Sequence, residues 1–446
     1  MSADVSIGDG DARLKAHALR AAVLGEVHAR PFTPIDTPRR VLLFAFETTA
    51  ERGEADREAL SEFCVGRDIP APKPGSRHHR AALGATVLRW EQHSEFTTYT
   101  WELPNEGLLP FHPAASALAH PMGLLPQPGP LLVAIDLHLI GSSSANAAAG
   151  SVATLAADVT RLFDPASLAV AETGDGAALY ASDFQADPAG FVRILIVDRG
   201  LGPGRAGALV QRLLEIETYR TLALLGLPEA QRLAPTVGRI EMRLAEVTDE
   251  MQRTEGFEAN HRLLDELTAL AAELEAGAAA SLFRFGASRA YDQIVHLRLQ
   301  TIGDRAVAGH TTWSAFLARR MAPALQTCAA IEQRQANLST KLARAANLLR
   351  TRVDVELQQQ NRDLLQSMNR RTQLQLRLQA TVEGLSVAAI SYYVVGLFGY
   401  IMKGVHDAGV DFDVSLATAV FVPPAVGLIW WIVRRVRRRH VDAGDR

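Results

Sequence analysis

The sequence predicts an α+β protein in which a mixed α/β cytoplasmic domain is followed by a long helical stalk and two C-terminal transmembrane helices. Three observations support this class. Strand-forming segments occur only up to Asp198, and the chain has no glycine from Thr312 to Glu383. Two later stretches, 384–402 and 414–433, contain no charged residue at all. The N-terminal, central and C-terminal parts of the chain therefore differ in their pattern of apolar residues, which indicates a different structure for each.

The N-terminal domain is expected over residues 1–200. Runs rich in β-branched and aromatic residues, bounded by Pro, Gly and Asp, are typical of strands. The expected strands are Arg40–Thr49, Leu83–Gln92, Glu95–Leu103, Leu131–Ile140, Ala178–Phe184 and Phe191–Asp198. Helices are expected at Glu51–Val65 and Ser151–Phe163, and Pro70–Arg80 is expected to be a loop. Strands and helices interleave, which predicts a mixed sheet.

A helical region is expected over 201–310, with no strand after Asp198. Helices are predicted at Arg205–Leu225, over Glu229–Ala279 as one long helix or two, and at Ala280–Gln300, and Gly303 and Gly309 mark a break. The stalk follows over 311–383. As a single helix up to residue 402 it would be more than about 100 Å long, at 1.5 Å of rise per residue.

The stalk carries an imperfect apolar seam. Its members recur at three-, four- and seven-residue spacings: Val353, Leu357, Leu364, Met368, Leu374 and Leu378. Gln360 and Arg371 interrupt the row, where a regular coiled coil has apolar residues. Two interpretations remain open: an oligomer with a hydrated interior, or packing against the preceding helices.

Two membrane spans are predicted, at 384–402 and 414–433, joined by an outer loop at 403–413. A bilayer core about 30 Å thick needs about 20 apolar residues of helix, and both runs fit. The tail, 434–446, begins with an arginine cluster, and Arg370, Arg371 and Arg377 precede the first span. Because positive residues stay in the cytoplasm, we expect an inner-membrane protein with both termini cytoplasmic. No signal peptide is recognisable in residues 1–20.

The amino-acid composition limits which binding partners are expected. The formal net charge of −3 gives no indication of nucleic-acid binding, and the two cysteines, Cys64 and Cys328, fit a reducing compartment. Eight basic against four acidic residues lie between Lys341 and Glu383, a pattern that attracts anionic headgroups or only fixes topology. The expected partners are the lipid bilayer and further copies of this chain, and no cofactor is expected.

The segment Gly202-Pro-Gly204-Arg-Ala-Gly207 matches the glycine pattern of dinucleotide-binding loops. That fingerprint needs a second parallel strand about 30 residues further on, whereas this chain stays helical. A turn that joins the α/β domain to the helical region is the favoured interpretation. On the following helix, Glu217 and Arg220 are three residues apart and predict an ion pair. Glu215 and Tyr219 are expected at a contact between the two regions.

Histidines gather in the N-terminal half. The candidate ligand site there comprises Glu26, His28, Arg30, His78 and His79, with Glu91 and His93 nearby in sequence. Histidine is the commonest metal ligand, but the spacing matches no known metal motif, so the metal is left undecided. Surface roles are the simpler alternative for these side chains.

The first span holds the candidate pore or helix-contact residues: Gly396, Gly399, Tyr400 and Met402. Small residues allow transmembrane helices to approach closely. Neither span contains an ionisable side chain, which argues against a proton-coupled pump. Pro423-Pro424 is expected to kink or locally unwind the second span.

Three strings resemble a bacterial family of membrane-anchored proteins of unknown function: His28-Ala29-Arg30-Pro31-Phe32, LEIETYR at 214–220, and VEGLSVAAISYYVVGLFGY at 382–400. The resemblance covers almost the whole chain and implies membrane anchoring, without catalytic residues. The order of parts is also similar to that of CorA-type magnesium transporters. Their Gly-Met-Asn motif is absent here, where Gly399-Tyr-Ile-Met-Lys403-Gly404 ends the first span.

Three functions follow from these observations. The favoured hypothesis is a non-enzymatic scaffold or sensor anchored in the inner membrane. The first alternative is a CorA-like homo-oligomeric channel for divalent cations. The second alternative is an enzyme or metal site on the N-terminal α/β domain.

Overall fold

The computed structural model describes residues 6–7, 14–15, 17–20, 23–24, 32–105, 110–111, 121–142, 161–409 and 413–444, and the side chains up to residue 435. The chain divides into two compact units. The first, here called the sheet unit, comprises Met1–Val247 and Leu267–Arg344. The second comprises Thr248–Glu266 and Ala345–Arg446. The expected mixed α/β domain, long helix and further C-terminal helix are all present.

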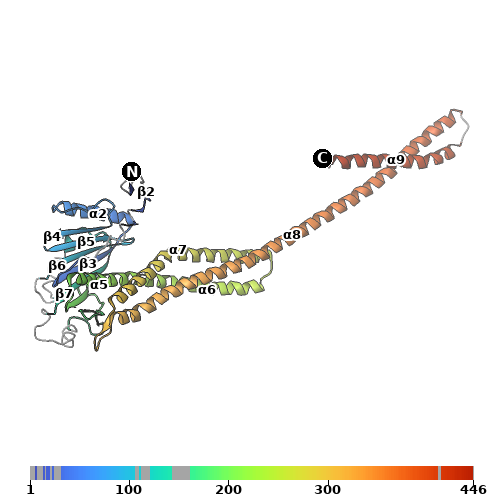
Figure 1. Ribbon diagram of the computed structural model, residues 1–446. Coiled ribbons are helices and arrows are strands. Elements are labelled where there is room, and N and C mark those ends of the chain that lie inside the picture. Colours follow the sequence, from blue (N-terminus) through green and yellow to red (C-terminus); the bar gives the residue numbers. More distant parts are fainter. Residues whose placement is uncertain are drawn as a thin grey trace. The chain divides into compact units, whose positions relative to one another are not determined.

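A nine-stranded sheet forms the centre of the sheet unit (Figure 1). Its strands run in the order β11-β8-β9-β10-β7-β3-β6-β5-β4. Their bounds are β3 (Arg39–Glu47), β4 (His78–Leu83), β5 (Thr86–Gln92), β6 (Phe96–Pro104), β7 (Leu131–Gly141), β8 (Ala169–Glu172), β9 (Ala178–Ser182), β10 (Val192–Asp198) and β11 (Arg305–Ala306). Only β7 and β10 pair in parallel. A separate short pair joins β1 (Ser6–Ile7) to β2 (Leu14–Lys15).

The expected strands are confirmed, but five described strands were missed: β1, β2, β4, β8 and β11. β4 begins inside the predicted loop Pro70–Arg80, because an edge strand with polar residues has weak alternation. β8 has four residues and β11 two, too few to show a period. β11 also contradicts the expectation of no strand after Asp198. Of the predicted helix Ser151–Phe163, residues 151–160 lie outside the described part of the chain.

The helices are α2 (Ala50–Val65), the 3₁₀ turn η1 (Pro121–Leu124), α5 (Pro203–Leu224), α6 (Gly226–Arg253), α7 (Phe257–Ile302), α8 (Trp313–Asp407) and α9 (Val414–Gly444). Of the two alternatives for Glu229–Ala279, two helices are confirmed, because α6 ends at Arg253. The expected boundary between Ala279 and Ala280 is wrong, because α7 continues through it. Gly256, with φ of +103°, makes the turn between α6 and α7, and glycine adopts that conformation without strain. Gly303 and Gly309 mark the break between α7 and α8 as predicted.

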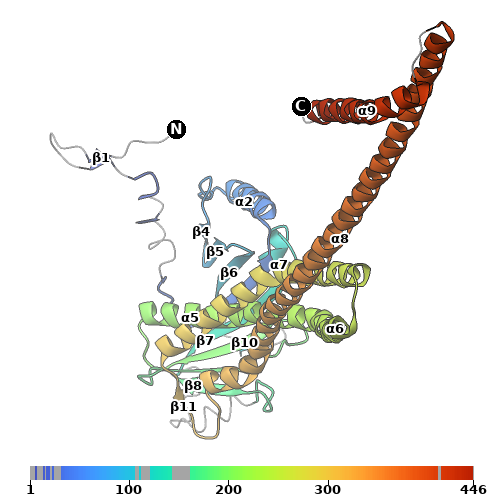
Figure 2. The same ribbon diagram turned by 90° about the vertical axis from the view of Figure 1, so that its right-hand side faces the viewer.

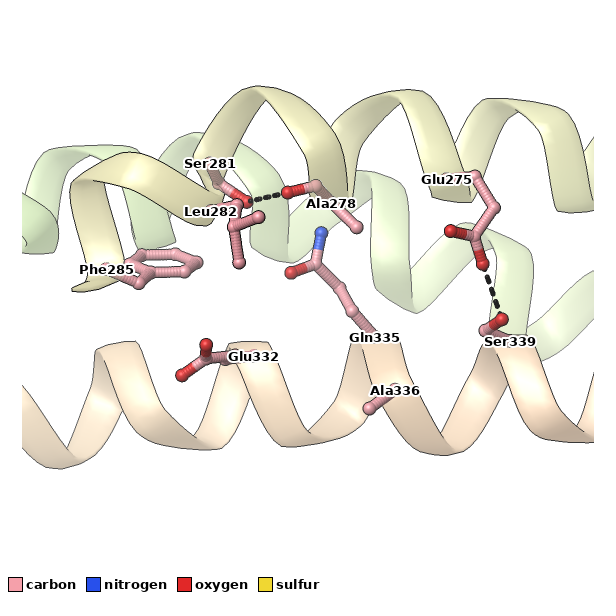
Figure 3. A pocket seen from close by; sticks show the side chains of 9 residues that line it. All are labelled: Glu275, Ala278, Ser281, Leu282, Phe285, Glu332, Gln335, Ala336 and Ser339. Carbon is pink, nitrogen blue, oxygen red and sulfur yellow. Dashed lines mark hydrogen bonds between the residues drawn. The ribbon is translucent and has the colours of Figure 1, made fainter.

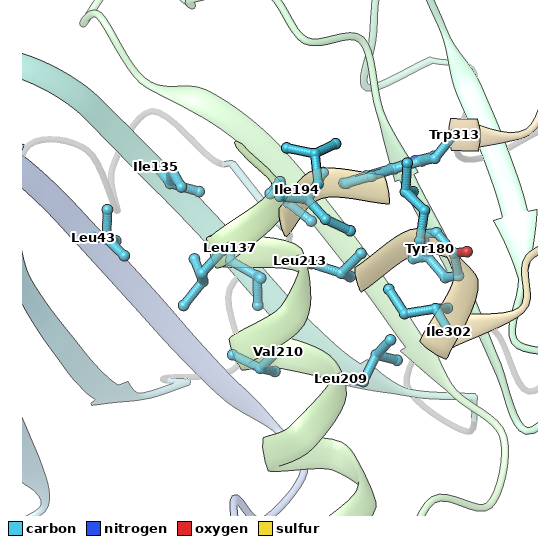
Figure 4. Close-up of a cluster of buried hydrophobic side chains, with 14 of the residues drawn as sticks. Leu43, Ile135, Leu137, Tyr180, Ile194, Leu209, Val210, Leu213, Ile302 and Trp313 are labelled. Carbon is cyan, nitrogen blue, oxygen red and sulfur yellow. The ribbon is translucent and has the colours of Figure 1, made fainter. Parts of the chain in front are cut away.

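One face of the sheet packs against helices. Alternate residues of the central strands, among them Leu43, Ile135, Leu137 and Ile194, point to this face. Figure 4 shows them meeting Leu209, Val210 and Leu213 of α5, while Tyr180 lies beside Ile302 and Trp313. Fully burying one such aliphatic side chain stabilises a fold by about 1.5–3 kcal/mol. This core therefore fixes α5, the end of α7 and the start of α8 on one side of the sheet.

The opposite face is covered in part by α2 (Figure 2). Leu60 and Phe63 of α2 pack with Trp90 and Trp101 of the hairpin β5–β6. Asp56 is buried among them and accepts hydrogen bonds from Trp90 Nε1, at 2.8 Å, and from the Tyr99 hydroxyl. Burial raises the pKa of the Asp56 carboxyl, although these two bonds oppose the rise.

Ion pairs join the three long helices within the sheet unit. Arg239 of α6 pairs with Glu273 of α7, and Arg334 of α8 donates to Glu241 of α6 at 2.6 Å. Arg289 of α7 pairs with Glu332 of α8. α6, α7 and the first part of α8 therefore form one packed layer.

Candidate functional site

Two described helices are long and apolar enough to cross a membrane by length and composition. The qualifying stretch of α8 has a mean hydropathy of 1.7 and is 6% buried, and that of α9 has 2.0 and is 11% buried. The core helix of a soluble protein has a mostly buried apolar surface, and these stretches do not. The large exposed side chains include Leu385, Tyr400, Leu416 and Val420.

α8 and α9 contact each other along one face of each. The rings of Phe398 and Phe421 stack with centroids 3.9 Å apart. Ser391 of α8 and Ala425 and Ile429 of α9 are buried in the same contact region. Their four- and seven-residue spacings are those of a helix face. The two helices form an antiparallel hairpin, here called the α8–α9 hairpin. Most of the other large apolar side chains described in this hairpin are exposed, among them Tyr392 and Leu416.

The four candidate pore or helix-contact residues separate into two groups. Gly399 lies against α9, where a Cβ at this position would be 3.8 Å from the side chain of Thr418. Met402, three residues further, is half-buried on the same side. Gly396 and Tyr400 lie on the exposed side, and a Cβ on Gly396 would meet nothing within 4 Å. The sequence treated these residues as one set, whereas helical geometry gives them different neighbours.

The end of the α8–α9 hairpin near the tail pairs aromatic rings with arginines. The guanidinium carbons of Arg434 and Arg435 each lie 4.9 Å from a ring centroid, over Trp430 and Trp431 respectively. Tryptophan and arginine are typical of the boundary between lipid and water. α9 remains one helix through Pro423 and Pro424, so the local unwinding that was one of two expectations does not occur.

The candidate N-terminal ligand residues do not assemble in the described part of the chain. Glu26, His28 and Arg30 lie outside the described residues. His78 and His79 are on the edge strand β4, where His78 is exposed and His79 Nε2 lies 3.8 Å from Cys64 Sγ. Burial lowers the pKa of His79. Within the described residues, no group of three metal-ligating side chains comes together.

The ion pair that the spacing predicts within segment 214–220 is present. Arg220 donates two hydrogen bonds to the fully buried Glu217, one of them 2.8 Å long. Burial raises the pKa of Glu217, and Arg220 opposes that rise. Glu215 pairs with Arg298 of α7, and Tyr219 stacks on Tyr291 of α7 at 5.4 Å. The segment therefore connects α5 to α7, and Tyr219 also contacts Phe96 of the sheet.

The glycine-rich segment 202–207 is the junction between β10 and α5. Gly202 caps α5 and Pro203 occupies its first turn. The Ile35 amide donates to the Pro203 carbonyl at 3.0 Å, and a Cβ on Gly207 would come within 1.9 Å of the Thr33 carbonyl oxygen. α5 is followed by α6 and not by a parallel strand, so the turn interpretation is confirmed.

Sequence reasoning missed a buried charged cluster on the central strands. Asp136 of β7 accepts two hydrogen bonds from Arg40 of β3, at 2.9 and 2.8 Å. His138 Nε2 lies 3.3 Å from the Asp136 carboxylate, and His138 is 2% exposed. Burial would raise the pKa of Asp136, but His138 and Arg40 together lower it below its usual value. Two polar residues inside the apolar run of β7 were the available signal.

A pocket of about 700 Å³ lies between α7 and the first turns of α8. Its walls are largely apolar, with Leu299, Leu317 and Met321 among them. Among its polar residues, Asp292 lies 3.3 Å from His296, and Asp304 accepts two hydrogen bonds from Ser314. Burial raises the pKa of Asp292.

Comparison with known proteins identifies a family and little else. The family model described as a protein of unknown function (DUF3422) matches residues 15–440. No curated protein matches this chain. One solved structure, "structure of the full-length CmaX protein", is 14% identical and covers 68% of this chain and 89% of that chain. Its TM-score of 0.14 is too low to support any argument about fold. This chain belongs to the DUF3422 family, whose function is unknown.

Proposed function

We propose that this protein is anchored in a membrane by the α8–α9 hairpin and acts there as a non-enzymatic scaffold or sensor. The observation that carries the proposal is the exposure of apolar side chains around a hairpin of helices, each long enough to span a bilayer. In water, such a surface would cost about 25 cal/mol for every Å² left exposed. In lipid the same surface is in its preferred solvent.

The charged residues support an orientation for this anchor. Lys403 is the one basic residue of the outer loop other than histidine, whereas Arg434 and Arg435 begin the tail. The loop also carries Asp407, Asp411 and Asp413. By the positive-inside rule, both ends of the chain stay in the cytoplasm and the loop faces outward across the inner membrane. The basic residues before the first span would then lie beside anionic headgroups.

Self-association is part of the proposal. Between Val353 and the first span, the apolar side chains of α8 are exposed: Leu357, Leu364, Leu365, Met368, Leu374, Leu376, Leu378 and Val382. A second copy of the same helix offers the matching seam, interrupted by Gln360 and Arg371. A scaffold or sensor built on a homo-oligomer would bury this row.

Extraction of the full-length protein tests the anchor. Membranes from expressing cells are washed with alkaline carbonate, which removes peripheral proteins, and then with detergent. We expect the wild-type chain to stay in the carbonate pellet and to dissolve only in detergent. Release of most of the protein by carbonate would refute anchoring by the hairpin.

A second candidate function is a CorA-like homo-oligomeric channel for divalent cations. It is favoured by the order of parts, with an N-terminal sheet domain, antiparallel helices, one long helix and a two-helix end. Gly396 and Tyr400 occupy the side of the first span that faces away from α9, where a pore-lining face would be. Lys403 at the end of that span would repel cations.

Oligomer size separates the two candidates. Light scattering of the detergent-solubilised protein, corrected for bound detergent, gives the number of chains. A ring of five or so copies, with flux of divalent cations in liposomes that Tyr400→Ala alters, is the result the channel predicts. A monomer or dimer would exclude it, because two spans per chain cannot then enclose a pore.

A further inference from the structure

Within the sheet unit, α8 packs against α6 and α7 through residues that alternate at spacings of four and three. These buried positions are Ile331, Gln335, Leu338 and Leu342. Ile331 shares a core with Leu233 of α6 and Phe285 of α7. Gln335 is 4% exposed, and Figure 3 shows its side chain directed from α8 toward α7. The spacing is that of knobs-into-holes packing, and this contact includes an amide as well as aliphatic side chains.

The same alternation recurs without a break on an exposed face of α8 in the second unit, here called the far face. Its members are Gln358, Asn361, Leu365, Met368, Thr372, Gln375, Gln379, Val382, Ser386, Ala389, Tyr393, Gly396 and Tyr400. All of them are exposed. The far face therefore continues in one phase from the stalk through the first span, with the spacing that packs helices together elsewhere on α8.

The far face lies away from α9. Ser391 and Phe398 are on the side of α8 that meets α9. Each residue turns an α-helix by about 100°, so Tyr393 and Tyr400, two residues after each of these, lie on nearly the opposite side. A Cβ on Gly396 would meet no atom within 4 Å. The α8–α9 hairpin therefore leaves this face open to a partner.

Two tyrosines at the middle of the first span point to a protein partner. Tyr392 and Tyr393 are 77% and 75% exposed, and their rings meet edge to face with centroids 5.9 Å apart. Among the described residues, neither hydroxyl makes a hydrogen bond. Tyrosine is enriched at the boundary between lipid and water. In mid-span neither water nor a lipid tail can accept the hydroxyl proton, so another protein chain must do so.

The distribution of charge indicates which chain that is. Copies that associate around an axis along the membrane normal are parallel, so each residue comes close to its own counterpart. A charged face would then repel itself. The far face has no charged residue, although residues 358–400 include six: Arg362, Asp363, Arg370, Arg371, Arg377 and Glu383. All six lie on other faces of α8, which suits the far face to contact with a second copy.

We propose that copies of this chain associate in the membrane through the far face, with their first spans parallel. The inference rests on the membrane anchoring proposed above and names the surface through which the chain self-associates. The Tyr393 ring of one copy packs between Ala389 and Gly396 of the next, where small residues leave room for it. The tyrosine hydroxyls of neighbouring copies lie at one depth and bond to one another. Amides of the stalk continue the contact in the cytoplasm and fix its register.

Cysteine cross-linking in membranes tests this contact. Ala389→Cys and Gly396→Cys place a thiol on the far face, and Val394→Cys places one on another exposed side of the same span. The wild type, with both cysteines buried, gives the background. After oxidation with copper phenanthroline, we expect at least fivefold more product with the mass of two chains from each far-face variant than from Val394→Cys. Disulfides need Cα atoms within about 7 Å.

A bulky side chain on the far face should separate the copies. Gly396→Leu, combined with Ala389→Cys, should reduce the cross-linked product at least fivefold. Gly384→Leu is the matched control, because Gly384 also meets no atom within 4 Å but lies off the far face, and it should leave the product unchanged. Both glycines are in the same uncharged stretch, so the two variants add the same side chain to the same span.

Carbonate extraction of every variant separates failure of this contact from failure of the anchor. Far-face cross-linking no stronger than that of Val394→Cys, in protein that stays in the carbonate pellet, would overturn the contact and leave the anchor intact. A product unaffected by Gly396→Leu would do the same, as would a product with the mass of this chain joined to a different protein. Release of the wild type by carbonate would overturn both proposals.

Discussion

Leu137 and Ile194 in the sheet unit are completely buried, whereas Leu385 and Val420 in the α8–α9 hairpin are 72% and 69% exposed. Charged residues are distributed in the opposite way between the two regions. Asp136 and Arg40 are nearly buried and paired in the sheet unit, while the 384–402 and 414–433 stretches contain no charge. The two regions follow opposite rules, and each rule fits a different solvent. Apolar burial with paired charges suits water, and an exposed apolar surface without charge suits lipid.

The largest effect on stability is expected from a substitution that removes one partner of the buried ion pair. Asp136→Ala should lower the free energy of unfolding of the sheet unit by about 3–5 kcal/mol, because Arg40 would lose the carboxylate that offsets its largely buried charge. Denaturant unfolding followed by tryptophan fluorescence measures the loss. The double variant Arg40→Met/Asp136→Leu should recover most of it, and a single variant as stable as the wild type would show that the pair is not desolvated.

An unpaired charge introduced into the α8–α9 hairpin should weaken membrane anchoring, whereas the paired charges of the sheet unit are tolerated. Leu428→Arg introduces a charge into the second half of the 414–433 stretch, and an arginine at the centre of a span costs about 2.5–3.5 kcal/mol to insert. The fraction of protein in the carbonate-resistant membrane pellet should fall sharply. Leu364→Arg is the control, since Leu364 is equally exposed on α8 but lies before the first span. Equal pellet fractions for both variants would contradict the comparison.

Substituting alanine for two glycines tests the same comparison, with a smaller expected effect on stability. Gly207→Ala should destabilise the sheet unit by about 1–3 kcal/mol, because the new Cβ would collide with the Thr33 carbonyl oxygen. Gly396→Ala adds the same methyl group where no atom lies within 4 Å and should leave the melting temperature of the sheet unit unchanged. Thermal melting of both variants is the measurement. Similar losses for the two would mean that close packing does not distinguish them.

The smallest expected effect is a pH dependence from Glu217. Burial raises its pKa in the folded chain, so this carboxyl contributes stability below its unfolded pKa of about 4.3 and loses it as pH rises through the folded value. Relative to Glu217→Gln, the wild type should therefore become less stable with rising pH. Asp136 has the opposite sign, because its pKa is lowered. Urea unfolding across a pH series checks both, and a constant difference for Glu217→Gln would contradict the first.

Local patterns were enough to predict most of the fold. Strand-forming composition located β3, β5 and β7, alternation located β6, and uncharged length located the two apolar helices. Short or polar edge strands were missed, because β4, β8 and β11 owe their conformation to pairing with neighbours and not to their own sequence. The turn at Gly256 was also missed, since one glycine inside a helical pattern does not show whether the helix ends.

The sites were less predictable than the fold, for a physical reason. Glu217 and Arg220 are neighbours on one helix, so their pairing could be predicted from spacing. Arg40 reaches Asp136 across 96 residues of sequence, because β3 and β7 pair in one register. Sequence spacing contains no information about such long-range registers when only one sequence is read.

Accessibility of the loop between α8 and α9 tests the central claim most directly. A cysteine is introduced by Ala408→Cys in one variant and by Lys73→Cys, in an exposed loop of the sheet unit, in another. Both native cysteines, Cys64 and Cys328, are buried. Intact spheroplasts are treated with a membrane-impermeant maleimide. Membrane crossing with cytoplasmic termini predicts that the Ala408→Cys variant is labelled at once and the Lys73→Cys variant only after lysis. Protection of both variants until lysis would contradict the account.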